Sequence, residues 1–130
     1  MSARSYEAAV GLLMLILACQ PVASVAGDAP IPSLSRQVQP IFDANCVACH
    51  QAGGAQQGLV LESGIAFRNV GKRSSEAALN LIEAGKPDAS YLLQKLNGTG
   101  QGARMPLGAA LDPADIETIR LWILGGAKND

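Results

Sequence analysis

The chain has 130 residues and a formal net charge of −1 at pH 7, and 48% of its residues are hydrophobic but only 4% aromatic. This length allows one domain at most. A near-neutral charge without a basic stripe argues against a nucleic-acid partner. So few aromatic side chains predict a thin hydrophobic core.

The segment 1–26 is expected to be a signal peptide. Residues 10–18 form an uncharged apolar run, which suits the hydrophobic region of a signal peptide and is too short to span a membrane. Arg4 gives a weakly positive start, Pro21 follows the run, and small residues lead to an expected cleavage after Ala26. The mature chain would then have no transmembrane span.

Residues 16–19, Ile-Leu-Ala-Cys, offer a second processing route. They resemble a loose lipobox, in which Cys19 would be lipidated and become the new N-terminus, although Leu17 fits this pattern poorly. We favour the alternative that Cys19 is an apolar residue of a discarded peptide. Either route exports the chain, and the second would tether it to a membrane through Cys19.

A short lead-in and a helix are expected next. Residues 27–33 contain two prolines and predict an extended stretch. A helix should follow over residues 34–46, because apolar residues recur there at helical spacing. Those residues are Leu34, Val38, Ile41 and Phe42. Pro40 predicts either that the helix starts near it or that the helix is kinked there. Residues 46–50 should form its last turn.

That turn reads Cys-Val-Ala-Cys-His, the C-x-x-C-H attachment sequence of a c-type haem. Positions i, i+3 and i+4 share one face of a helical turn. Cys46 and Cys49 can therefore form thioethers with one edge of a porphyrin, while His50 binds the iron as an axial ligand. His50 is the only histidine in the chain. Such haem is attached outside the bacterial cytoplasm, which agrees with export to the periplasm.

Other readings of the motif are half of a zinc site, a disulfide, or chance. A structural zinc ion requires four protein ligands, and the only other cysteine, Cys19, lies in the expected targeting segment. A disulfide between Cys46 and Cys49 would resemble a thioredoxin-type motif, but no alternation of strands and helices surrounds it. We favour covalent haem.

The middle of the chain gives weaker signals. Residues 51–58 are rich in glycine, alanine and glutamine and predict a loop, after which the apolar run 59–61 could cover one edge of a haem. A short helix is expected over 76–83, and a clearer one from Asp88, before a glycine-rich loop over 97–102. The apolar side of the second helix consists of Leu92, Leu93 and Leu96.

The last helix has the clearest boundaries. Asp112 is expected as its N-cap, with Pro113 in the first helical position and Asp115 in the first turn. Gly125 should end it. Its apolar stripe consists of Ile116, Ile119, Leu121, Trp122 and Ile123. No strand pattern or internal repeat is visible, so the predicted fold class is mostly α.

Met105 is the candidate for the second axial ligand of the iron. Met1 and Met14 leave with the signal peptide, and no second histidine exists, so Met105 is the only methionine or histidine left for that position. It precedes Pro106 in a glycine-rich loop that the proline stiffens. The alternative is that Met105 fills the core, the more usual role of methionine.

The chain resembles a class I c-type cytochrome in three features taken together. These are a helix ending in C-x-x-C-H, a later Met-Pro loop and a terminal Trp-Ile helix. The resemblance covers about residues 34–126, and 34–128 would be the domain. It includes Val-Gln-Pro-Ile-Phe over 38–42, Gly-Lys-Pro over 85–87 and Leu-Trp-Ile over 121–123. It implies a small helical domain wrapped around one covalent haem c, in which the first and last helices cross beside the haem.

The sequence differs from many members of that family at two places. A glycine is common four residues before the helix aromatic, and Val38 stands there, which predicts a wider helix crossing. A proline whose carbonyl accepts the second N–H of the histidine often follows the motif. Here Gln-Ala-Gly-Gly follows over 51–54, so no acceptor can be identified.

The resemblance implies an electron carrier and not an enzyme. One haem with His50 and Met105 as axial ligands would cycle between Fe(III) and Fe(II), passing electrons to periplasmic redox proteins in small, transient encounters. Lys95 and Arg104 are candidate charged residues near the exposed haem edge. The alternative is a haem sensor or a peroxidase-like enzyme in which the sixth iron position is open.

Overall fold

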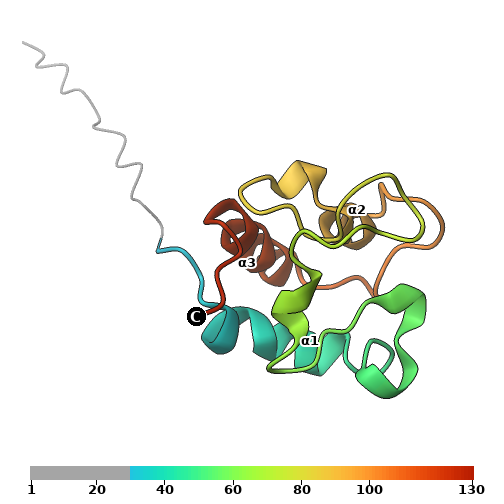
Figure 1. Cartoon of the computed structure of the whole chain (residues 1–130), viewed down its shortest axis with the longest axis horizontal. Coiled ribbons are helices and arrows are strands. Elements are labelled where there is room, and N and C mark those ends of the chain that lie inside the picture. Colours follow the sequence, from blue (N-terminus) through green and yellow to red (C-terminus); the bar gives the residue numbers. More distant parts are fainter. Residues whose placement is uncertain (1–29) are drawn as a thin grey trace, which may run out of the picture.

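The computed structural model describes residues 30–130, in which three α-helices and several shorter helical turns follow one another (Figure 1). The α-helices are α1 (Gln39–Asn45), α2 (Tyr91–Asn97) and α3 (Pro113–Leu124). The shorter pieces are the π-helical turn η1 (Leu34–Val38) and the 3-10 turns η2 (Ala52–Gly54), η3 (Gln56–Gly58), η4 (Ala66–Asn69) and η5 (Pro87–Ala89). No strand occurs in these residues, and the predicted mostly α class is confirmed.

The structure does not describe residues 1–29. The expected signal peptide with its cleavage after Ala26, the lipidation site at Cys19 and the start of the lead-in (27–29) therefore lie outside the described residues. From Pro30 onward, no helix combines the length and the apolar character that crossing a membrane requires. The described chain enters η1 through a short stretch without regular secondary structure.

The first helical segment widens just before Pro40. In η1, the N–H groups of Val38 and Gln39 donate to carbonyls five residues back. Proline has no N–H, and its ring collides with the carbonyl four residues back in a regular α-helix. A wider π turn changes the position of that carbonyl. The α-helix itself begins at Gln39, with Pro40 in its first turn, which confirms the predicted start near this proline; it ends at Asn45, one residue before the predicted end.

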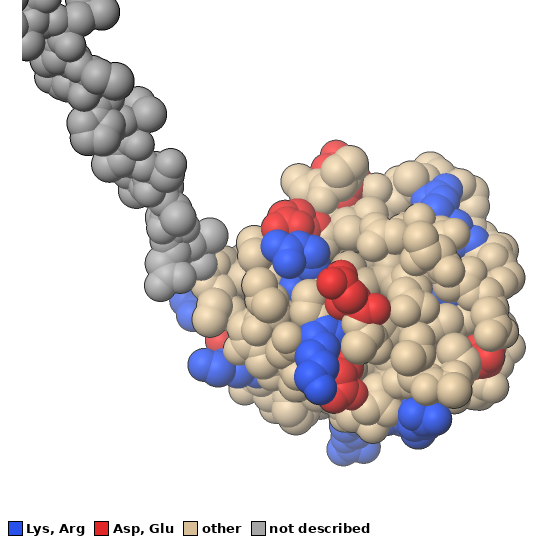
Figure 2. All heavy atoms as spheres, turned by 90° about the horizontal axis from the view of Figure 1, so that it is seen from above, with Lys and Arg blue, Asp and Glu red and all other residues tan. Residues whose placement is uncertain are grey.

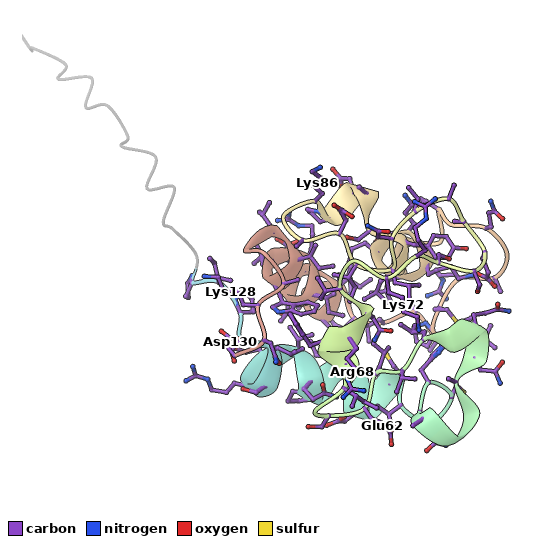
Figure 3. All side chains as sticks on the ribbon, in the orientation of Figure 1. Glu62, Arg68, Lys72, Lys86, Lys128 and Asp130 are labelled. Carbon is purple, nitrogen blue, oxygen red and sulfur yellow. The ribbon has the colours of Figure 1, made fainter. Side chains whose placement is uncertain are left out.

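Asp130 satisfies backbone donors at the start of this segment. The N–H of Leu34 donates to the Asp130 side chain at 2.9 Å, and the N–H of Ser35 donates to the Asp130 carbonyl at 3.0 Å. Figure 3 shows Asp130 beside the first turn of η1. The first N–H groups of a helix have no partner within the helix. Here Asp130, the C-terminal residue, accepts hydrogen bonds from two of them.

The first and last helical segments meet in the core, as the resemblance implies. Phe42 and Trp122 are buried and pack edge to face, with ring centroids 6.4 Å apart and an interplanar angle of 80°. The indole N–H of Trp122 donates to the carbonyl of Lys128 at 2.9 Å. Val38, which stands where a glycine is common, belongs to the same core cluster and has 0% exposure.

Helix α3 has the predicted boundaries. The Asp112 carboxylate accepts from the N–H of Ala114 at 2.8 Å, Pro113 is the first helical residue, and the helix ends before Gly125. Ile119, Trp122 and Ile123 are buried on one side. The N-cap and the proline fix this helix through contacts within its own first turn, so its start could be predicted locally.

The predicted helix over residues 76–83 is wrong. Ser74 and Leu81 instead belong to backbone that folds back on itself: the N–H of Ser74 donates to Leu79, and the N–H of Leu81 donates to Lys72. The Ser74 hydroxyl accepts from the N–H groups of residues 76 and 77, which offers the backbone a turn in place of a helix. Isolated β-bridges also hold this part of the chain. They pair Val70 with Ile82, Arg73 with Asn80, and Asn80 with Ser90.

Helix α2 starts later than predicted. The turn η5 covers Asp88, and buried Ser90 separates it from α2 by accepting from the N–H of Glu83 at 2.8 Å and donating to the carbonyl of Lys86 at 3.0 Å. The predicted apolar side is buried. The helix ends at Gly98, whose φ of 73° is a left-handed conformation that favours glycine.

Among the glycines of the described residues, Gly125, the C-cap of α3, leaves the least room for a side chain. A Cβ added there would collide with Cγ2 of Ile31, in the stretch before η1. Its φ of −74° suits any residue, so the conflict would be purely steric. The prolines on both sides of Ile31 restrict how far that segment can move.

We expect Gly125→Ala to destabilise the protein by about 1–2 kcal/mol through overpacking against Ile31. Thermal or denaturant unfolding measures the change. Ile31 is 56% exposed, so Ile31→Ala alone should cost little and should restore most of the loss in the double variant. Equal losses in the single and double variants would show that Ile31 is not the obstacle.

Candidate haem site

The C-x-x-C-H residues form a tight turn directly after α1. The carbonyl of Cys46 accepts from the N–H of Cys49 at 3.1 Å and from the N–H of His50 at 3.0 Å. The N–H of Cys46 still donates to Phe42 at 2.8 Å, so the turn is joined to the helix that packs on Trp122. The turn thus brings both sulfurs and the imidazole together through bonds to one carbonyl.

The two thiols of this turn are free and differ in burial. Cys46 is half-buried and packs against the hydrophobic core, whereas Cys49 is exposed. Burial raises the pKa of the Cys46 thiol to about 11, so it is protonated at neutral pH. Among residues 30–130, no group of three or more histidine, cysteine or acidic side chains could hold a metal ion, so the half zinc site is not completed there.

His50 has one ring nitrogen without a protein partner. Its Nδ1 is buried and makes no hydrogen bond within the described part of the chain. Its backbone carbonyl accepts from the N–H of Leu61 at 2.8 Å, which fixes the residue at the edge of the core. The missing acceptor agrees with the sequence, in which none could be identified. A buried imidazole nitrogen without a partner is unfavourable. If the other ring nitrogen binds the iron, Nδ1 is the second N–H, and it has no acceptor within the described residues.

Polar contacts hold the glycine-rich loop after His50. The Glu62 carboxylate accepts from the N–H of Ala52 at 2.7 Å, and the Lys72 ammonium donates to the carbonyl of Gly58 at 2.5 Å. Both Glu62 and Lys72 are labelled in Figure 3. The loop is thus fixed at its beginning and its end.

The run predicted to cover a haem edge packs on α1. Leu61 is buried, while Leu59 is half-buried against the core. The side-chain amide of Gln39 donates to the carbonyl of Leu61 at 2.8 Å, which joins the run to the helix that leads into the motif. The other half-buried apolar residues on this core are Cys46, Val47, Val70 and Ile116.

Met105 lies on a separate loop, which joins α2 to α3 (Figure 1). It is half-buried, and its N–H donates to the carbonyl of Lys95 at 2.9 Å. The structure therefore groups Cys46, Cys49 and His50 on one turn, and it attaches Met105 to α2.

Three side chains form a polar cluster where the Met105 loop meets α2, and of these the sequence singled out only Lys95. The Tyr91 hydroxyl donates to the Glu76 carboxylate at 2.9 Å, and Lys95 lies 3.7 Å from the same carboxylate. The Lys95 ammonium also donates to the carbonyl of Gln101 at 2.7 Å. Burial and the neighbouring Glu76 raise the pKa of Tyr91. Glu76 lies in the segment wrongly predicted as helical, so no sequence signal could have indicated this contact.

Residues 35–126 match the family model described as Cytochrome c. The match spans well over half of the chain, and the protein belongs to the cytochrome c family. No curated protein and no solved structure gives a significant match. Membership in this family establishes covalently bound haem c as the cofactor and haem-based electron transfer as the general function.

The residues on the Cys46–His50 turn fit that cofactor. Two free thiols stand three residues apart, and the imidazole of the only histidine directly follows the second of them. Half-buried apolar side chains adjoin the turn. Cys46 and Cys49 would hold the porphyrin and His50 would bind its iron, which is the assignment that the C-x-x-C-H pattern predicted.

Replacing Cys46 or Cys49 by alanine should remove one thioether, and replacing both should leave haem that denaturation extracts. The measurement is the intact mass after expression in a host that attaches haem: wild-type protein should carry the peptide mass plus one haem. The double variant serves as the unattached control. Wild-type protein with an unmodified mass would contradict the assignment.

Tyr91→Phe should loosen the Met105 loop and lower the free energy of unfolding by about 1 kcal/mol, the usual loss for one hydrogen bond. Unfolding of the haem-loaded protein measures it. In a Glu76→Gln background, the same substitution should cost less, because the charged acceptor is gone. Additive losses would mean that the hydroxyl does not act through Glu76.

Proposed function

We propose that this protein is a monohaem electron carrier in which His50 and Met105 bind the two axial positions of the iron. The observation that carries the proposal is the Cys46–His50 turn, which places two free thiols and the only histidine of the chain on consecutive hydrogen bonds to one carbonyl. Met105 supports it, because its loop is attached to α2 through the backbone of Lys95 and through the bond from the Lys95 ammonium to the carbonyl of Gln101.

The haem supplies a one-electron couple between ferric and ferrous iron. His50 and Met105 would keep the iron six-coordinate in both states, so that electron transfer requires little rearrangement. The neutral thioether of Met105 favours the ferrous state and raises the potential. The apolar side chains around the turn act in the same direction, because the ferric state carries the extra charge.

We infer that the protein is not an enzyme. With His50 bound to iron, no second histidine exists to act as a base beside it. The alternative is a haem sensor or peroxidase-like enzyme with an open sixth position, which requires that Met105 only packs. Ferric protein with an absorption band from methionine bound to iron favours the carrier, and a high-spin spectrum favours the alternative.

We also propose that the carrier works in the bacterial periplasm, with 1–26 removed as a signal peptide, 27–33 as a lead-in and 34–128 as the cytochrome domain. Tethering through a lipidated Cys19 remains the second route. On the face that Figure 2 shows, acidic and basic side chains are interspersed among uncharged ones. Such a surface suits brief docking to redox partners better than strong electrostatic steering.

Met105→Ala should keep the haem attached but lower the midpoint potential by on the order of 0.1 V, within the roughly 0.8 V range that axial ligands span. The open position should bind carbon monoxide, which wild-type protein should resist. Redox titration and carbon monoxide difference spectra measure both effects.

Leu107→Ala is the matched control, since Leu107 lies in the same loop and is 69% exposed. It should change neither the midpoint potential nor the carbon monoxide reactivity. If Met105→Ala behaves like this control, Met105 is a packing residue and the sensor or enzyme alternative gains support.

A further inference from the structure

The side chain of Arg104 is folded back across the loop that carries Met105. Its Nη2 donates to the carbonyl of Gly108 at 3.2 Å, so the guanidinium bridges the two sides of the Met-Pro turn. Its aliphatic stem packs on Gly98, where an added Cβ would lie 3.1 Å from the Arg104 Cδ. Both ends of the side chain are therefore fixed.

The other terminal nitrogen of this guanidinium has no partner. Arg104 Nη1 is buried and makes no hydrogen bond to residues 30–130, and within that range it shares this condition only with His50 Nδ1. An arginine stays charged at any ordinary pH. The charged groups packed near this loop, Lys95 and Glu76, pair with each other and not with Arg104. Arg104 itself is half-buried, but a fixed guanidinium with a buried donor and no counter-ion indicates an anion that is not part of the polypeptide.

We propose that Arg104 Nη1 donates a charge-assisted hydrogen bond to a propionate of the haem. The propionates are the only anionic side groups of haem c, and the planar guanidinium matches carboxylate geometry. The bond would join the haem to the loop of Met105 from the residue next to it. The inference deepens the proposed function, because it needs the attached haem and its redox couple, but it does not need Met105 as a ligand.

Such a bond has a consequence for the redox equilibrium. The cation cancels the charge of one propionate and holds the pKa of that carboxyl low. Without Arg104, the propionate charge would favour ferric iron at neutral pH. Its pKa would rise above the ordinary carboxyl range of about 4, so the midpoint potential would fall as the pH increases through that pKa.

The experiment is a redox titration of haem-loaded wild-type, Arg104→Gln and Arg36→Gln proteins between pH 5 and 8. Arg36 is the matched control, because it is an exposed arginine in η1, at the other end of the first helical segment from the motif. Wild type and control should show a midpoint that hardly changes with pH. Arg104→Gln should lower the ferrous-to-ferric ratio about tenfold at pH 7, roughly 59 mV for one electron, and should recover toward wild type as the pH falls.

A second measurement needs no variant. Haem labelled with ¹³C at its propionate carboxyls allows each carboxyl to be titrated by NMR in ferrous wild-type protein. One propionate should stay ionised down to about pH 4, below the other. Two propionates that both titrate above pH 5 would overturn the proposal.

A flat pH profile in Arg104→Gln, parallel to that of Arg36→Gln, would also overturn it. If Arg104 only braces the loop, Arg104→Gln protein should bind carbon monoxide, but its midpoint potential should not change with pH through the pKa of a carboxyl. Failure of the carrier function is visible separately: wild-type protein would then be high-spin, while the titrations of its propionates could still be read.

Discussion

One backbone carbonyl, that of Cys46, determines the geometry of the site. By accepting from both Cys49 and His50, it closes a turn in which two sulfurs and an imidazole are presented together. The pattern of cysteines and histidine supplies the chemical groups, but it is this bifurcated contact that sets their relative positions. The turn is continuous with a helix whose Phe42 is packed on Trp122, so the last helix supports the site through the core.

The two sides of the site are held in different ways. The cysteine side rests on helix packing and on Gln39, which binds the carbonyl of Leu61. The methionine side depends on polar contacts between a loop and α2, centred on Glu76 and Lys95. Packed helices resist local opening, whereas loops held by few contacts open at lower cost. The methionine loop is thus expected to open at lower cost than the cysteine turn.

Local signals made parts of this structure predictable. Asp112 and Pro113 specified the start of α3, and apolar spacing placed the first helical segment, η1 together with α1, within one residue of its observed bounds. The motif residues were found by type and spacing alone. Prediction failed where side chains compete with the helix: the Ser74 hydroxyl binds the backbone of a turn, and residues 76–83 follow an irregular path. Contacts that depend on that path, such as Glu76 with Tyr91, could not be read from the sequence.

The bond between Asp130 and the first turn of η1 fixes where the C-terminus of the domain lies relative to the C-x-x-C-H turn. It places the C-terminus beside the point where the described chain begins, as Figure 1 shows. The C-x-x-C-H turn follows the opposite end of the first helical segment, roughly 15–20 Å away at helical rise. A linker, tag or surface joined at Asp130 therefore lies at the end of the first helical segment that is away from the C-x-x-C-H turn. If the protein is attached through such a linker, the length of the linker sets how far the haem end can move from the point of attachment.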